Sequence, residues 1–147
     1  KKILKRKYDE FDNFKSHMVS ALIKKIYEAE LYLNLLGTGK PLRQFMYAKD
    51  LARVIKIIID KDIYNSLNVS PPENFTISDI AKIGIKACDK EYLEINWDSS
   101  KPDGQFRKDV TSKNLMNVLP EFTFTSLEEG IRWTYTYYKQ NLAGENK

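Results

Sequence analysis

Apolar residues recur at every third or fourth position in several stretches of the chain, which is the spacing that gives a helix one apolar face. This pattern predicts helices over residues 16–31, 50–61, 76–87, 111–119 and 126–141. Ser16, Thr76 and Ser126 stand at the starts of three of them, where a hydroxyl can accept a hydrogen bond from a backbone amide. On the second helix the apolar positions expected to face the core are Leu51, Val54, Ile55, Ile58 and Ile59.

Short apolar runs between these helices predict strands over residues 31–36, 43–47, 66–69 and 92–97. Residues 98–109 are polar, contain Pro102 and Gly104, and predict a loop. Because helices and strands alternate through the middle of the chain, the pattern indicates an α/β or mixed α+β fold.

Composition narrows the class of protein. At 147 residues, with 42% hydrophobic residues and no long apolar run, the chain is expected to form a single soluble domain and to cross no membrane. Cys88 is the only cysteine, so a reducing compartment, the cytoplasm, is its expected location. The formal charge is +4, and positive charge is concentrated only in residues 1–7. We interpret that run as a solvated face, with nucleic-acid binding as the weaker alternative, because no RNA-binding or zinc motif accompanies it.

Residues 36–52 give the first indication of a chemistry. Gly37 and Gly39 allow a turn, and Arg43 follows at the head of the next strand. A guanidinium held there presents a rigid fork of donors that matches a phosphate or a carboxylate. The stretch therefore predicts an anion site, and a surface arginine on a hairpin is the alternative. It does not predict a dinucleotide-binding turn, because the chain has no G-x-G-x-x-G and the glycines lead into a strand rather than a helix.

Four segments stand in a fixed order along the chain. They are Ser16-His17-Met18-Val19-Ser20-Ala21-Leu22-Ile23-Lys24-Lys25, Gly37-Thr38-Gly39-Lys40-Pro41-Leu42-Arg43-Gln44-Phe45-Met46-Tyr47, Lys101-Pro102-Asp103-Gly104-Gln105-Phe106-Arg107-Lys108 and Ser126-Leu127-Glu128-Glu129-Gly130. Together they make residues 8–141 resemble the GDP-L-fucose synthases, a family of reductase-epimerases among the extended short-chain dehydrogenases. The resemblance implies the C-terminal, substrate-binding part of that fold, without the N-terminal Rossmann half. Residues 1–147 would form one sugar-nucleotide-binding domain, in which residues 1–7 are unmatched and the tail, 142–147, frays.

The family's reaction, as the resemblance implies it, is epimerisation of GDP-4-keto-6-deoxymannose at two carbons and then hydride transfer from NADPH. His17 matches a histidine at the junction of cofactor and substrate, which implies a catalytic proton donor and a cofactor contact. The missing half would bind most of the NADPH and supply the family's Tyr-x-x-x-Lys dyad. Tyr135 and Lys139 have that spacing too, but they lie in the terminal helix, and we interpret them as packing and surface residues. No metal site is predicted.

The resemblance also implies the residues that bind the sugar nucleotide, which are Lys25, Leu36, Arg43, Asp103 and Lys108. Arg43 and Lys25 suit a phosphate, and Asp103 suits a hydrogen bond from the ligand. Lys108 and its neighbour Arg107 would add positive potential towards a diphosphate. For Lys25, Arg107 and Lys108, a solvated cation without a ligand remains the alternative.

Leu36 stands where the family typically has a tryptophan, so apolar contact is kept while ring stacking is lost. The chain is expected to be the substrate-binding part of a GDP-L-fucose synthase-like enzyme, inactive until a Rossmann half or partner chain supplies the cofactor site. One alternative is a non-catalytic binding module. Another is a related GDP-sugar epimerase or reductase that acts on a different 4-keto sugar. The family's tendency to dimerise also leaves a homodimer open.

Overall fold

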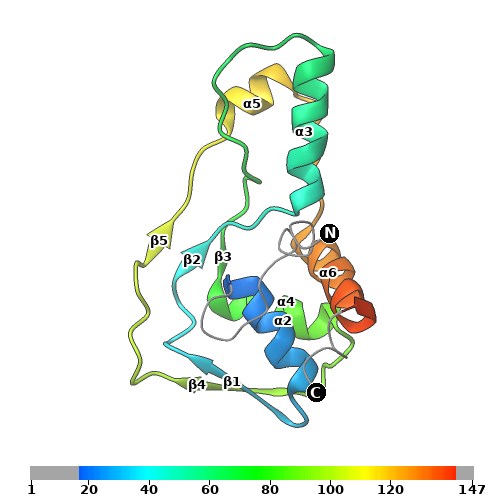
Figure 1. Cartoon of the computed structure of the whole chain (residues 1–147). Helices are drawn as coiled ribbons and strands as arrows, with labels where there is room; N and C mark the ends of the chain where they lie inside the picture. The colour runs from blue at the N-terminus through cyan, green and yellow to red at the C-terminus, as the bar shows by residue number, and fades with distance from the viewer. Residues whose placement is uncertain (1–16, 142–147) are drawn as a thin grey trace.

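The computed structural model describes residues 17–141, and the predictions for residues 1–7, Ser16 and the tail lie outside this range. The elements in chain order are α2 (Met18–Glu28), β1 (Tyr32–Leu36), β2 (Leu42–Arg43), α3 (Ala48–Asp60), β3 (Phe75–Thr76), α4 (Ile77–Ala87), β4 (Glu94–Asp98), β5 (Arg107–Lys108), α5 (Lys113–Val118) and α6 (Leu127–Asn141). Helices α2, α4 and α6 gather at one end of the molecule, and α3 and α5 lie at the other (Figure 1). The fold is mixed α/β, as the sequence predicts.

The strands form two small sheets. β1 and β4 pair in parallel, from Tyr32 opposite Glu94 to Leu36 opposite Asp98. In the second sheet β2 lies in the middle, antiparallel to β3 and parallel to β5. Two connections therefore lead from the first sheet to the second. Residues 37–41, the first crossover, join β1 to β2, and residues 99–106, the second crossover, join β4 to β5.

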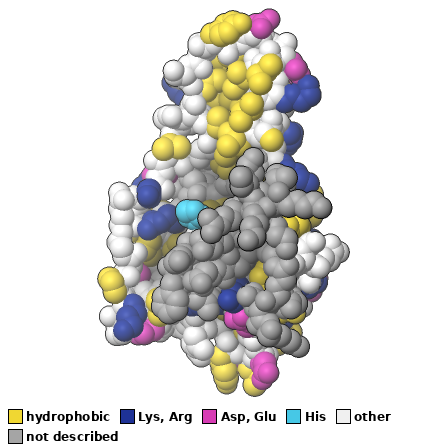
Figure 2. All heavy atoms as spheres, viewed as in Figure 1, with side chains coloured by type: hydrophobic (Ala, Val, Ile, Leu, Met, Phe, Trp, Pro, Cys, Tyr) yellow, Lys and Arg dark blue, Asp and Glu magenta, His cyan; other side chains and the backbone are white. Residues whose placement is uncertain are grey.

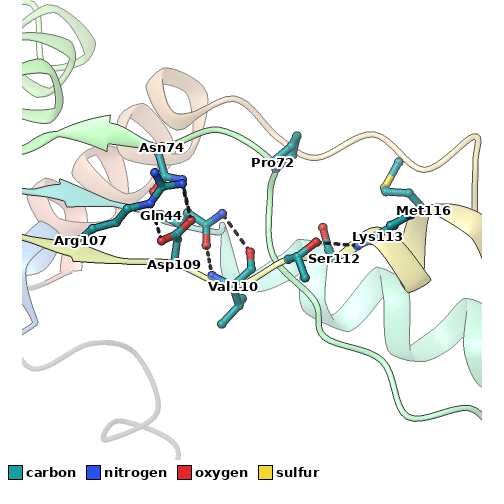
Figure 3. A pocket seen from close by; sticks show the side chains of 10 residues that line it. Gln44, Pro72, Asn74, Arg107, Asp109, Val110, Ser112, Lys113 and Met116 are labelled. Atoms are coloured by element: carbon teal, nitrogen blue, oxygen red, sulfur yellow. Dashed lines mark hydrogen bonds and ion pairs between the residues drawn. The ribbon is translucent and has the colours of Figure 1, made fainter.

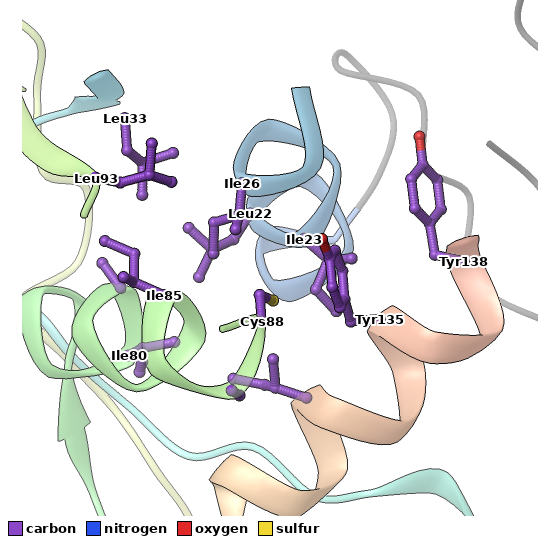
Figure 4. Packing of buried hydrophobic residues seen from close by; sticks show 13 residues of the cluster. Leu22, Ile23, Ile26, Leu33, Ile80, Ile85, Cys88, Leu93, Tyr135 and Tyr138 are labelled. Carbon is purple, nitrogen blue, oxygen red and sulfur yellow. The ribbon is translucent and has the colours of Figure 1, made fainter. Parts of the chain in front are cut away.

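The main hydrophobic core lies between α2, α4, α6 and β1 (Figure 4). Ile23, Ile26, Ile80 and Ile131 are each at most 1% exposed there. Lys90 closes the C-terminal end of α2, because its ammonium donates hydrogen bonds to three carbonyls there at 2.8 to 2.9 Å. This end of the molecule buries the apolar faces of its helices against one another.

A second, smaller cluster lies at the α3 end. Val54 and Leu115 are fully buried in it. Asp50, also buried, ties the start of α3 to the segment before α6. Its carboxylate accepts hydrogen bonds from the amide and hydroxyl of Thr125, at 2.8 and 3.0 Å, and from Arg53 at 2.8 Å. These bonds satisfy a buried carboxylate that would otherwise be costly to fold around.

Helix caps follow the sequence closely. The Asp79 amide donates to the Thr76 hydroxyl at 2.9 Å, and the Asp79 carboxylate accepts from the Thr76 amide at 3.2 Å, which completes a capping box. Such a cap stabilises a helix by about 1 kcal/mol. Ser126 accepts from the amide three residues further on, at 3.3 Å, as expected at the start of α6. At the start of α2 the cap position is His17.

The strand predictions need correction. Residues 66–69 form no strand, because a strand requires a hydrogen-bonded neighbour and none of the described strands pairs with them. The strand expected over 43–47 is limited to Leu42–Arg43, and the one expected over 92–97 is shifted to Glu94–Asp98. The predicted loop contains β5. Its two residues, Arg107 and Lys108, are both charged and pair with β2 through backbone groups, so no apolar pattern in the sequence indicates this strand.

Helix α3 departs most from expectation. Val54 is buried, but three of the apolar positions expected beside it are exposed, namely Leu51 at 39%, Ile55 at 48% and Ile59 at 68%. Hydrophobic side chains gather on this end of the molecule in the space-filling view (Figure 2). The helical period is correct, and what the described part of the chain lacks is a surface that covers this face.

The interpretation of Tyr135 and Lys139 as packing and surface residues agrees with the structure. Tyr135 is 6% exposed in the main core, and the Lys139 ammonium lies 4.5 Å from the centre of its ring. The Tyr135 ring also meets Tyr27 edge-on, with the ring centres 6.3 Å apart. The pair therefore belongs to the packing of α6.

Candidate functional site

The first crossover depends on its two glycines. Gly37 and Gly39 have φ values of +85° and +73°, in the left-handed region that side chains rarely adopt. Space is tight as well, because a Cβ on Gly37 would collide with the Asp103 carboxylate, and one on Gly39 would lie 2.7 Å from the Trp97 ring. The glycines therefore let the first crossover lie directly against the second crossover and the end of β4.

Thr38 and Asp103 connect the two crossovers. Thr38 donates its backbone N–H to one carboxylate oxygen of Asp103 and its hydroxyl to the other, each at 2.6 Å. The hydroxyl bond and then the amide bond lower the pKa of Asp103 below its ordinary value, and the charge of Lys40 adds to the effect. Asp103 is therefore an ionised acceptor at neutral pH, which suits a hydroxyl group of a ligand and not a phosphate.

Arg43 lies on the middle strand of the second sheet and not on a hairpin, since β1 and β2 do not pair. In the register of β2 with β5, Arg43 is the partner of Lys108. Paired residues project from the same face of a sheet, so the two cations are neighbours. Arg43 is half-buried, and one of its guanidinium donors bonds the Leu42 carbonyl at 2.7 Å. Two cations on neighbouring strands give this face of the sheet a positive charge that suits a phosphate or diphosphate.

Lys25 and Leu36 lie together near the C-terminal half of β1. The Lys25 ammonium reaches from α2 to donate a hydrogen bond to the Asn34 carbonyl at 3.2 Å. Leu36 ends the strand and is 63% exposed. Asp103 lies beside the glycine turn that follows Leu36, where it accepts the hydrogen bonds of Thr38.

His17 is exposed at the cap position of α2, and its side chain makes no capping hydrogen bond. In Figure 2 the single histidine, drawn in cyan, lies beside Lys and Arg side chains on the same face of the molecule. His17 is therefore accessible on a face that also carries positive charge.

A cleft of about 350 Å³ lies beside β5, between the second sheet and α5 (Figure 3). Arg107 projects into it and is paired with Asp109, at 2.8 and 2.9 Å, which lowers the pKa of Asp109. Gln44 crosses the cleft and exchanges hydrogen bonds with the backbone of Val110. Arg107 is therefore engaged in an ion pair here and does not strengthen the positive face that carries Lys108.

The predicted site residues come from three places. One is β1 with its neighbours, namely Leu36 on β1, Lys25 on α2 and Asp103 on the second crossover. The others are the second sheet, with Arg43 and Lys108, and the start of α2, with His17. The first crossover links the first two places. Within residues 17–141 no three His, Cys, Asp or Glu side chains are placed to hold a metal ion together. No helix in this range is long and apolar enough to cross a membrane.

Thr38 and Trp97 also shape this site, although sequence reasoning singled out neither. A threonine between two turn glycines is a cue for a side-chain hydrogen bond, so Thr38 could have been noticed. Trp97 could not, because its place beneath Gly39 follows from the pairing of β4 with β1, in which it is opposite Leu35. That pairing joins segments far apart in the sequence.

A dinucleotide does not fit the described residues by themselves. In the glycine turn, the amide of Gly37 bonds the Asp98 carbonyl at 2.9 Å and the amide of Thr38 bonds Asp103, so these donors are not presented to a phosphate. The turn then leads into β2 and not into a helix N-terminus. A cradle for a cofactor pyrophosphate would have to come from outside residues 17–141.

Known proteins are similar to this chain in sequence and in fold. The pattern of the NAD dependent epimerase/dehydratase family matches residues 5–70. The chain is 31% identical over 149 residues to the GDP-L-fucose synthase of Dictyostelium discoideum, covering 95% of this chain and 46% of that protein. It is 34% identical over 141 residues to the GDP-L-colitose synthase of Yersinia pseudotuberculosis, covering 90% and 44%. A solved structure of a GDP-L-fucose synthetase from Naegleria fowleri bound to NADP superposes with a TM-score of 0.80 at 27% identity, covering 92% and 44%.

The fold and these matches define the class, because the chain has part of an extended short-chain dehydrogenase fold of the epimerase and dehydratase type. Within that class, the resemblance to the GDP-L-fucose synthases is confirmed over almost the whole chain. The chain spans about half the length of the curated relatives that it matches.

Proposed function

We propose that this chain is the substrate-binding part of a GDP-L-fucose synthase-like enzyme, which epimerises and reduces GDP-4-keto-6-deoxymannose with NADPH. Its single domain binds the GDP-sugar, while the rest of the enzyme holds most of the cofactor. The observation that carries this proposal is the register of Arg43 with Lys108, which sets two cations side by side on one sheet face. Two adjacent cations provide positive charge for the two phosphates of a diphosphate.

The other residues divide the ligand between them. Lys25 supplies a further positive charge near the end of β1. Asp103, ionised and acceptor-only, takes a hydrogen bond from a ligand hydroxyl. Leu36 offers exposed apolar surface at the same edge. Cations bind the diphosphate, and the β1 end contacts the sugar.

His17 supplies acid–base chemistry in this proposal. Reduction of a ketone needs a proton donor beside the developing alkoxide, and an accessible imidazole serves that purpose near neutral pH. In this proposal the chain does not turn over alone, since the Gly37 and Thr38 amides of the glycine turn are already bonded within the chain and offer a cofactor pyrophosphate no donors there. Incubation with NADPH and GDP-4-keto-6-deoxymannose should leave the NADPH absorbance unchanged. Turnover by this chain alone would contradict that part of the proposal.

Calorimetric titration of the chain with GDP tests the binding role directly. Arg43→Ala should weaken GDP binding at least about tenfold, because a charge-assisted hydrogen bond contributes about 1.5–3 kcal/mol. Lys82→Ala, which removes an exposed cation from α4, is the matched control and should leave the affinity unchanged. Absence of GDP binding by the unaltered chain would favour the non-catalytic module instead.

A second candidate substrate is another GDP-linked 4-keto sugar. Leu36, whose aliphatic side chain is exposed, favours it, and a GDP-L-colitose synthase is among the proteins similar to this chain. The affinities of the chain for GDP-L-fucose and GDP-L-colitose compare the two candidates. Leu36→Trp, which restores a stacking ring, should change the ratio of the two affinities if Leu36 contacts the sugar. An unchanged ratio would exclude Leu36 from substrate selection.

A further inference from the structure

The first crossover is held on both of its sides. On one side, the Gly39 carbonyl accepts a hydrogen bond from the Ser78 amide at 2.9 Å, and the Pro41 carbonyl accepts one from the Ile77 amide at 2.9 Å. These bonds attach its later residues to the start of α4. Backbone groups make them, so they do not depend on which side chain the crossover carries.

On the other side, the Gly37 amide donates a hydrogen bond to the Asp98 carbonyl at 2.9 Å, and Thr38 reaches the second crossover. The Thr38 amide and hydroxyl bond the two carboxylate oxygens of Asp103, each at 2.6 Å. The absence of a Cβ at Gly37 makes room for that carboxylate. The hydroxyl bond is a side-chain contact, and a single substitution can remove it.

The residues proposed to contact the ligand lie on the strands before and after the crossovers that Thr38 and Asp103 connect. Leu36 ends β1 two residues before Thr38, and Arg43 follows it on β2. Lys108 lies on β5, at the far end of the second crossover. A change in the spacing between the crossovers would move Leu36 relative to the cation pair, and a binding site tolerates such a shift poorly.

We propose that Thr38 is a positioning residue, whose hydroxyl holds Asp103 and thereby sets the spacing of the two crossovers that the ligand spans. The inference rests on the proposed function, because it assumes that a GDP-sugar contacts both sheets. Asp103 then has two roles, because its carboxylate holds the first crossover through Thr38 and also contacts the ligand.

Thr38→Val and Thr38→Ser test this inference as a pair. Valine keeps the shape of threonine and the backbone hydrogen bond but has no hydroxyl, whereas serine keeps the hydroxyl. We expect Thr38→Val to weaken GDP-mannose binding about tenfold in calorimetry, while Thr38→Ser binds like the unaltered chain. The pKa of the Asp103 carboxyl, followed by NMR, should rise towards its ordinary value in Thr38→Val and stay low in Thr38→Ser.

The outcomes separate the two proposals. Equal GDP-mannose affinity in Thr38→Val and the unaltered chain would overturn the positioning role and leave the binding role intact. No GDP-mannose binding by the unaltered chain would contradict the proposed function. The hold of Thr38 on Asp103 would then be judged by the carboxyl pKa alone, and an unshifted pKa in Thr38→Val would overturn it as well.

Discussion

The two ends of the molecule bury their apolar residues to different extents. At the end formed by α2, α4 and α6, the apolar faces meet one another and residues such as Ile26 and Ile80 are fully buried. At the α3 end, the helix has an equally regular apolar pattern, yet Leu51, Ile55 and Ile59 remain exposed. A regular pattern therefore shows which face of a helix is apolar, and packing partners decide whether that face is covered.

The difference bears on the proposed function. The chain spans about half the length of its relatives, and residues 66–69 have the composition of a strand without a described partner. If the chain is part of a larger enzyme, as proposed, we expect the rest of that enzyme to cover the exposed face of α3. The main core, by contrast, packs side chains of α2, α4, α6 and β1 against one another.

Substitutions on the two apolar faces should give the largest contrast. Ile80→Ala removes a fully buried side chain and should lower the free energy of unfolding by about 3 kcal/mol, because it leaves a cavity. Ile59→Ala removes a side chain that is mostly in solvent and should change it by less than about 0.5 kcal/mol. Urea denaturation of both variants measures the difference. Equal losses would show that the α3 face is covered in solution.

Helices and caps were predictable from the sequence because their determinants are local. The Thr76 box and the Ser126 cap depend on residues three positions apart, and both form as expected. The strand predicted over residues 66–69 does not form and β5 forms where a loop was predicted, because pairing depends on a neighbour elsewhere in the chain. The exposed face of α3 was missed for the same reason.

The candidate site divides in the same way. The glycine turn and Arg43 could be found from local spacing, and His17, Lys25 and Asp103 from the resemblance. The pairing of Arg43 with Lys108 required the register of β2 and β5. The contact of Thr38 with Asp103 spans 65 residues of sequence, so no local pattern reveals it.

Cys88 lies in the main core, and the pKa of its thiol reports how well water is excluded from that core. Burial raises the pKa of its thiol to about 12, with smaller effects from neighbouring charges such as Lys139. The unfolded chain ionises this thiol at about pH 8.5, whereas the folded chain keeps it neutral. The free energy of unfolding should therefore fall as the pH rises above that value, by about 1.4 kcal/mol per pH unit at most.

Cys88→Ala provides the control for this pH dependence. Burial also raises the pKa of Tyr135 and Tyr138, so these tyrosines add their own loss of stability at higher pH. The difference in slope between the unaltered chain and Cys88→Ala isolates the thiol. Identical slopes at about pH 9 to 10 would mean that water reaches Cys88 and that the main core is less closed than Figure 4 shows.

The smallest effect on stability is expected at the α3 face itself. Ile55→Lys with Ile59→Lys replaces two exposed apolar side chains by a residue that favours helices, so the free energy of unfolding should change by less than about 0.5 kcal/mol per site. Self-association at high protein concentration should nevertheless decrease, because contiguous exposed apolar surface promotes it. Light scattering across a concentration series measures this.

Tyr92→Lys is the matched control for the α3 variant, since Tyr92 is a 59% exposed aromatic residue in the turn between α4 and β4. It removes one exposed apolar side chain, against two in the α3 variant, from the opposite end of the molecule and should leave association unchanged. A decrease in association equal to that of the α3 variant would mean that exposed apolar area alone drives contact, wherever it lies. A decrease confined to the α3 variant would identify its apolar face as the surface through which this chain associates, and therefore as the surface that the rest of the enzyme would cover in the proposed function.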